Sequence, residues 1–185
     1  MKTTVAALLF LCAVGTIFAE ELRFRGLLSG RDAVYGIKKK MGTPEIVMAR
    51  NGKEFARIVA EDLTGSHGDM SGFPSVKWKT ECAVAIFIGT RPSAGYAVRV
   101  QKVVRRGSAI EVTVKEQKPA PGDLAAQVIT SPYTVIACNC KGIHLKEILM
   151  LKLIDPNGRT LVERPAWSYR LMQSSPPAET KKGSE

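Results

Sequence analysis

The strongest constraint on the fold lies between residues 83 and 115, where a continuous apolar run gives way to strict alternation. Residues 83–88 read AVAIFI, a run of strand length that predicts a central strand covered on both faces. Residues 96–104 and 110–114 alternate apolar and polar side chains, and a glycine turn separates them. The pattern predicts an antiparallel hairpin beside a buried strand.

The segment 51–63, NGKEFARIVAEDL, predicts a helix. Asn51 can cap its first turn, and Glu54, three residues later, can reach back to the start of the helix. One apolar stripe runs along the segment and consists of Phe55, Ile58, Val59 and Leu63. We therefore expect the helix to pack against a sheet.

Further strands are indicated elsewhere. The predicted strands cover residues 22–27 and 45–49, residues 133–138, and two segments on either side of the turn Asp155-Pro156-Asn157-Gly158. A short helix over residues 145–154 is the alternative for the first segment of that last pair. Many short strands with one helix predict a mainly β (α+β) fold, either an antiparallel β-sandwich or a small barrel with one packed helix.

The N-terminal segment predicts export. Residues 1–19 have the basic start, apolar stretch and small final residue of a secretory signal peptide. Leu11 precedes Cys12 where a lipid anchor needs a small residue, and charges follow too soon for a membrane span. We expect a periplasmic or extracellular protein of a bacterial envelope without a stable membrane anchor. Residues 20–170 should form a single β-rich domain and residues 171–185 a disordered tail.

The chain is basic. Its formal net charge of +10 falls to +9 when residues 1–19 are removed, because Lys2 is the only charged side chain among them. A basic surface favours weak contacts with anionic envelope polymers. The basic residues are mostly scattered over turns and tails, and export argues against nucleic acid as a partner.

Three cysteines follow the predicted cleavage site. In an exported protein we expect a disulfide between Cys82, which opens one strand, and either Cys138 or Cys140, which close another. An alternative metal site would combine the latter two with His144 and either Cys82 or His67, but the second closely spaced ligand pair of a zinc site is missing. We expect no metal and no cofactor.

The sequence contains no recognisable catalytic motif. It lacks a nucleophile elbow, a phosphate loop, a His-Glu-x-x-His helix and a dinucleotide fingerprint, and its two histidines fall in predicted loops. Hydrolytic catalysis needs a nucleophile, a base and an orienting group brought together. We therefore expect a protein that is not an enzyme.

Three segments together carry a family resemblance: IGTRPSAGYAVRV (88–100), EVTVKEQKPAPGD (111–123) and VITSPYTVIA (128–137). They resemble the PrcB C-terminal domain family, best over residues 73–138. The matching positions are Gly89, Pro92, Gly95, Tyr96, Pro119, Pro132 and Tyr133, while Ser93-Ala94 stands where Thr-Gly is usual. The resemblance implies an accessory or assembly subunit of a secreted or cell-envelope protease complex, with a subtilisin-like protease as partner.

The loop after the buried strand is the predicted partner-binding site. Pro92 and Gly95 should shape the turn, because proline sets φ and glycine permits conformations closed to other residues. Tyr96 is in phase with the apolar residues that follow it and should point inward. Arg91 and Ser93, at the predicted tip, are the expected partner contacts.

Two alternative functions remain. The sequences RPSAGY (91–96) and ERPAW (163–167) are similar to the inhibitory loops of chagasin-type cysteine protease inhibitors, which are immunoglobulin-like sandwiches. Such inhibition would require both loops at one end of the fold. The other alternative is a basic module that binds anionic envelope polymers through lysine and arginine.

Overall fold

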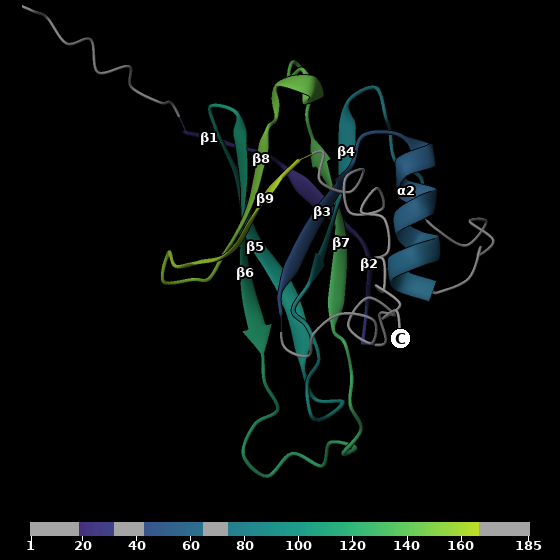
Figure 1. Cartoon of the computed structure of the whole chain (residues 1–185). Coiled ribbons are helices and arrows are strands. Elements are labelled where there is room, and N and C mark those ends of the chain that lie inside the picture. Colours follow the sequence, from purple (N-terminus) through teal and green to yellow (C-terminus); the bar gives the residue numbers. More distant parts are fainter. Residues whose placement is uncertain (1–18, 32–42, 65–73, 167–185) are drawn as a thin grey trace, which may run out of the picture.

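The computed structural model describes residues 19–31, 43–64 and 74–166, which form two β-sheets and short helical elements (Figure 1). Residues 1–18 of the predicted signal peptide, the predicted tail and His67 lie outside the described residues. Within the described residues the two sheets remain separate layers and do not close into a barrel. The sandwich alternative of the predicted mainly β fold is therefore confirmed.

The larger sheet has five strands. In spatial order they are β1 (Ala19–Glu21), β5 (Ala97–Arg106), β6 (Ala109–Gln117), β8 (Met150–Ile154) and β9 (Thr160–Pro165). Strands β5 and β6 form the predicted antiparallel hairpin, and β8 and β9 form the second one. The alternative helix is restricted to one 3₁₀ turn, η3 (Leu145–Glu147). Strands β6 and β8 are parallel, because the chain crosses to the other sheet between them.

The smaller sheet has four antiparallel strands. In spatial order they are β2 (Phe24–Gly30), β7 (Tyr133–Asn139), β4 (Glu81–Phe87) and β3 (Glu45–Ala49). The predicted strand 22–27 corresponds to β2, which begins two residues later and ends three residues later, while β1 just before it joins the larger sheet. The chain changes sheets at Leu22, which is buried and donates its N–H to the Val103 carbonyl at 2.9 Å.

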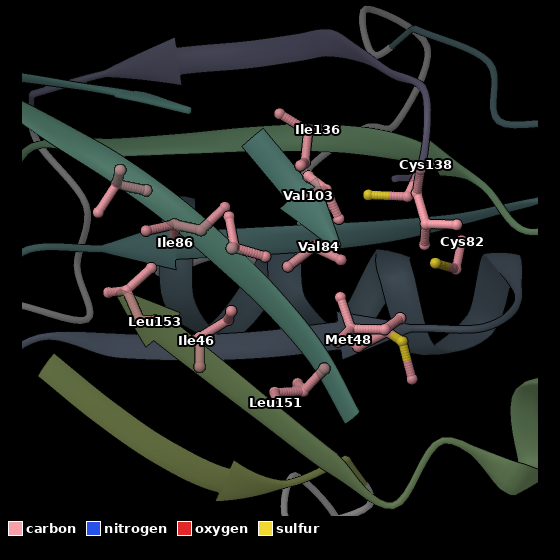
Figure 2. Packing of buried hydrophobic residues seen from close by; sticks show 14 of the residues in the cluster. Ile46, Met48, Cys82, Val84, Ile86, Val103, Ile136, Cys138, Leu151 and Leu153 are labelled. Carbon is pink, nitrogen blue, oxygen red and sulfur yellow. The ribbon is translucent and has the colours of Figure 1, made fainter. Parts of the chain in front are cut away.

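Strand β4 is covered on both faces, as predicted. Its side chains Cys82, Val84 and Ile86 point into the core between the two sheets. There they meet aliphatic side chains of the larger sheet, among them Val103, Leu151 and Leu153 (Figure 2). The alternating residues Ala83, Ala85 and Phe87 belong to a second core beneath the helix. Burial of each large aliphatic side chain, compared with its exposure to water, stabilises the fold by about 1.5–3 kcal/mol.

A β-bulge modifies the predicted alternation of β5. The pairing with β6 shifts between Val100 and Lys102, so that Val103 rather than Lys102 enters the core. One extra residue in a strand reverses which side chains face inward. The bulge therefore keeps the second half of β5 apolar on its inner face.

The helix covers the outer face of the smaller sheet. It begins as α2 (Gly52–Ile58) and continues as the π-helical segment η1 (Val59–Thr64). The predicted N-cap is confirmed, because Asn51 Oδ1 accepts the Glu54 N–H at 2.9 Å. The Glu54 carboxylate accepts the Arg50 N–H rather than the capping residue's own N–H. No helix in the described part of the chain is long and apolar enough to span a membrane.

Candidate functional site: two paired loops at one end of the sandwich

Two loops meet at the end of the sandwich that lies lowest in Figure 1. The β4–β5 loop comprises residues 88–96, which include all five predicted partner-binding positions. The β6–β7 loop comprises residues 118–132 and projects beyond the strands. The β4–β5 loop crosses from the smaller sheet to the larger one and the β6–β7 loop crosses back, so the site exists only in the folded sandwich.

Backbone hydrogen bonds join the two loops. Arg91 and Thr130 form a β-bridge in which each N–H donates to the other's carbonyl, at 2.8 and 2.9 Å. The Ala94 N–H donates to the Ala126 carbonyl at 3.0 Å. The Thr130 hydroxyl donates to the Ser93 carbonyl at 2.9 Å. The β4–β5 loop therefore acts as a support for the longer loop.

Gly95 allows the loops to approach closely. A Cβ atom placed at Gly95 would lie 2.6 Å from the Pro119 Cβ and 3.2 Å from the Ala125 Cβ. Its φ is not in the left-handed region, whereas that of Gly89 is, at 77°. The predicted conformational role thus belongs to Gly89, and the role of Gly95 is to leave room for Pro119.

The structure corrects the accessibility expected for Arg91 and Ser93. The Arg91 guanidinium binds Glu116 at 2.6 Å through Nε and 3.3 Å through Nη2. Its Nη1 also donates to the Thr90 carbonyl at 2.9 Å. Ser93 is only 4% exposed. Both predicted contact residues are thus held within the loop pair, while Pro92 is exposed and Tyr96 is half-buried.

The most exposed apolar side chains of the site lie on the β6–β7 loop. Leu124, Val128 and Ile129 are 106%, 52% and 69% exposed, and we call these three residues the apolar tip. A shallow hollow beside Leu124 is lined by both loops and by Arg31. Exposed apolar patches often mark sites of protein association. The sequence-based prediction placed the partner contacts within residues 91–96 and not on this segment, because no local pattern shows which apolar side chains of a loop stay exposed.

The three cysteines meet at the other end of β4. The Sγ atoms of Cys82 and Cys140 lie 3.0 Å apart, and Cys138 is the residue directly opposite Cys82 on β7. All three are buried. The pKa of Cys82 is raised by its hydrogen bond with Cys138, and that of Cys140 by its hydrogen bond with Cys82, with burial adding to both shifts. Cys82 and Cys140 are therefore protonated thiols at neutral pH and poor nucleophiles.

The metal alternative finds no support in the described residues. They contain no group of three or more His, Cys, Asp or Glu side chains placed to hold a metal ion. His144, which that alternative required, is exposed on the loop before η3.

The inhibitor alternative required two loops at one end of the fold. Strand β5 leaves the β4–β5 loop at Ala97, and its other end, Arg106, pairs with Ala109. Ala109 pairs in turn with Met150 of β8, and Met150 pairs with Pro165 of β9, so Pro165 lies at this same far end of the strands. The ten residues of β5 span about 33 Å. RPSAGY and the described part of ERPAW therefore lie at opposite ends of the larger sheet, contrary to that expectation.

The architecture defines a β-sandwich-like α+β domain with one helix packed on its smaller sheet. Residues 82–139 match the family model described as PrcB C-terminal, which confirms the resemblance expected from the sequence. No curated protein and no solved structure matches the chain. The matched segment runs from the first residues of β4 to the end of β7 and contains both loops.

Proposed function

We propose that this protein is an exported, non-catalytic accessory subunit of a protease complex, and that the apolar tip contacts the protease. The observation that carries the proposal is the PrcB C-terminal match over residues 82–139, which contains the whole loop pair. The family resemblance implies a secreted or cell-envelope complex with a subtilisin-like protease. The tip supplies a surface on which such a partner could bind.

The loop pair suits recognition because its support is already formed. The bridge between Arg91 and Thr130 and the bond from Ala94 to Ala126 hold the β6–β7 loop from within. A segment held in place before binding loses less conformational freedom when a partner arrives. Burial of Leu124 and its neighbours would then contribute about 25 cal/mol per Å² of apolar surface removed from water.

The polar groups near the tip favour a binding role over catalysis. The Arg91 guanidinium and the Glu116 carboxylate are hydrogen-bonded to each other. Ser131 has a hydroxyl without a hydrogen-bond partner among the described residues, but the residue is 2% exposed and out of reach of a substrate. A catalytic nucleophile needs both access and a neighbouring base.

Affinity purification from the native envelope tests the proposal. The full chain, tagged at its C-terminus, should retain a subtilisin-like protease that is identified by mass spectrometry and by its activity. Leu124→Asp should reduce recovery of the protease at least tenfold. Leu149→Asp is the matched control, because Leu149 is another exposed leucine but lies at the opposite end of the larger sheet.

The possible outcomes separate two parts of the proposal. Recovery of no protease with the unmodified chain would reject the subunit role. Equal recovery with the unmodified chain and with Leu124→Asp would retain that role and reject the tip as the contact surface. An equal loss with Leu149→Asp would also reject the tip, since the effect would then not depend on position.

A second candidate function has one specific observation in its favour. Arg99 and Lys115 lie directly opposite each other on β5 and β6, and both are exposed. Like charges in this position repel each other, so an anionic polymer bound across them would relieve the repulsion. We propose weak binding of anionic envelope polymers as an additional role. Retention on envelope extracts should fall steeply with salt and with the double variant Arg99→Gln, Lys115→Gln; retention that resists both would reject this role.

A further inference from the structure

Three thiols lie at the end of the smaller sheet opposite the loop pair, which we call the closed end. Figure 2 shows Cys82 and Cys138 there on neighbouring strands. Cys140 is the first residue after β7, and its Sγ lies 3.0 Å from that of Cys82. A disulfide bond has an S–S distance of about 2.05 Å, so these two sulfur atoms need to move about 1 Å closer. Two partners are therefore available to Cys82, and the backbone distinguishes between them.

The hydrogen-bond pattern disfavours Cys138 as the partner. The Cys140 N–H donates to the Thr80 carbonyl at 2.7 Å, which makes Glu81 and Asn139 a non-hydrogen-bonded pair of the antiparallel ladder. The two kinds of pair alternate, so Cys82 and Cys138, the next pair, are hydrogen-bonded. In hydrogen-bonded pairs the Cβ atoms are about 5.5 Å apart, whereas a disulfide requires about 3.8 Å. A bond to Cys138 would distort a hydrogen-bonded pair within the β4–β7 ladder.

Cys140 is less restricted, because its N–H still bonds to Thr80 but its carbonyl has left the ladder. It lies beyond the last residue of β7, where the chain turns and the Ile143 N–H donates to the Cys140 carbonyl. Its side chain reaches Cys82 diagonally rather than across a ladder rung. From this geometry we propose that the mature protein contains a Cys82–Cys140 disulfide and that Cys138 remains a buried free thiol.

The bond would form by exchange with a disulfide oxidant, such as oxidised glutathione or an envelope thiol oxidase. The first cysteine thiolate attacks the oxidant disulfide and releases one reduced thiol. The second thiolate then attacks the protein sulfur of this mixed disulfide and releases the other reduced thiol. Two cysteine thiols are oxidised and one oxidant disulfide is reduced. Because the native thiols are buried, we expect this exchange before β4 and β7 are fully paired.

The bond would connect the two ends of the segment that carries the loop pair. Cys82 and Cys140 are 58 positions apart: Cys82 is the first residue of the PrcB C-terminal match, and Cys140 directly follows its last. The proposal depends on the expected export to an oxidising compartment. It does not depend on a protease partner, so either proposal can fail without the other.

Differential thiol labelling tests the pairing in the unmodified protein. The full chain is expressed for export, recovered and denatured in N-ethylmaleimide, which labels free thiols. Reduction and iodoacetamide then label the cysteines that were paired, and fragment spectra distinguish Cys138 from Cys140. We expect N-ethylmaleimide on Cys138 and iodoacetamide on Cys82 and Cys140. N-ethylmaleimide on all three, a free Cys140 with a paired Cys138, or a bridge to Cys12 or to a second chain would overturn the proposal.

Two matched serine variants provide an independent measurement. Cys138→Ser should retain the bond and show no free thiol among the two remaining cysteines. Cys140→Ser should leave both Cys82 and Cys138 labelled as free thiols. If Cys140→Ser instead formed a Cys82–Cys138 bond as completely as the unmodified protein forms its own, the proposed restriction from the ladder would be wrong. Labelling of the unmodified chain remains decisive if a variant does not fold.

Discussion

Strands β4 and β7 run between two ends of the molecule, and apolar side chains are buried at one end and exposed at the other. At one end Cys82, Cys138 and Cys140 are buried within the core between the sheets, together with Leu22 and Ile148 from the connecting segments. At the other end, which we call the open end, the apolar tip of the β6–β7 loop is exposed to solvent. The same two strands lead to both ends. What differs is whether another layer covers the chain, because the tip lies beyond the facing sheet.

The largest expected effect concerns the closed end. Reduction of the proposed Cys82–Cys140 bond should lower the free energy of unfolding by about 4 kcal/mol, the chain-entropy value for a loop of 58 residues. Urea denaturation with and without reductant measures this difference. Cys138→Ser should respond to reductant as the unmodified protein does, whereas Cys140→Ser should not respond. Equal responses of the two variants would contradict the proposal that Cys140 rather than Cys138 is bonded to Cys82.

A matched pair of leucine substitutions compares a buried position with the open end. Leu153 is buried between the sheets and Leu124 is fully exposed. Leu153→Ala should lower the free energy of unfolding by about 2–5 kcal/mol, because it removes packed atoms and leaves a cavity. Leu124→Ala should change it by less than about 0.5 kcal/mol. Thermal and urea denaturation provide the measurement, and similar losses for both variants would show that the tip is buried in solution.

A glycine substitution tests the support of the open end. Gly95→Ala would place a Cβ 2.6 Å from Pro119, so the β6–β7 loop must shift, at a cost of about 1–3 kcal/mol in the free energy of unfolding. Limited proteolysis within residues 118–132 should become faster. Gly26→Ala is the control, because a Cβ there has no atom within 4 Å and the substitution should be neutral or slightly stabilising. Equal behaviour of the two variants would contradict the close packing at Gly95.

The smallest effect is a pH dependence at the closed end. The hydrogen bond from Arg25 and that from the Lys77 N–H lower the pKa of Glu81 below its ordinary value of 4.5. The stabilisation is therefore present above pH 4.5 and is lost as the pH falls through the folded-state pKa. Since the Arg25 side chain is 44% exposed, the contribution should stay below about 1 kcal/mol.

Denaturation at several pH values between neutral and acid tests this contribution. Glu81→Gln should remove this acid dependence, and Arg25→Gln should reduce it by a smaller amount, because the hydrogen bond from the Lys77 N–H to Glu81 remains. Unchanged acid dependence in both variants would show that this pair contributes nothing to stability.

Local chemistry accounts for what was predicted correctly. Asn51 caps α2 through a bond to Glu54 three residues away, and the apolar run of β4 indicates coverage on both faces. The two hairpins follow from alternation and turn residues. All of these features depend on neighbours close in the chain, so their patterns can be read from the sequence.

The features that were missed depend on contacts between distant segments. Ser93 is buried because its loop pairs with Thr130, and Gly95 is constrained by Pro119. The two sheets separate at Leu22, and β6 pairs with β8 in parallel after the chain has passed through the other sheet. Periodicity specifies which face of a segment is apolar but not which distant segment covers it.

The sequence by itself determined the mainly β class, the capped helix and the family resemblance, since each is carried by short patterns of neighbouring residues. The tertiary structure decided which loop residues are accessible and that the Sγ atoms of Cys82 and Cys140 lie 3.0 Å apart. Those outcomes depend on the register between β4 and β7 and on where the facing sheet ends. Register and coverage arise from packing among segments far apart in the chain, which no local pattern records.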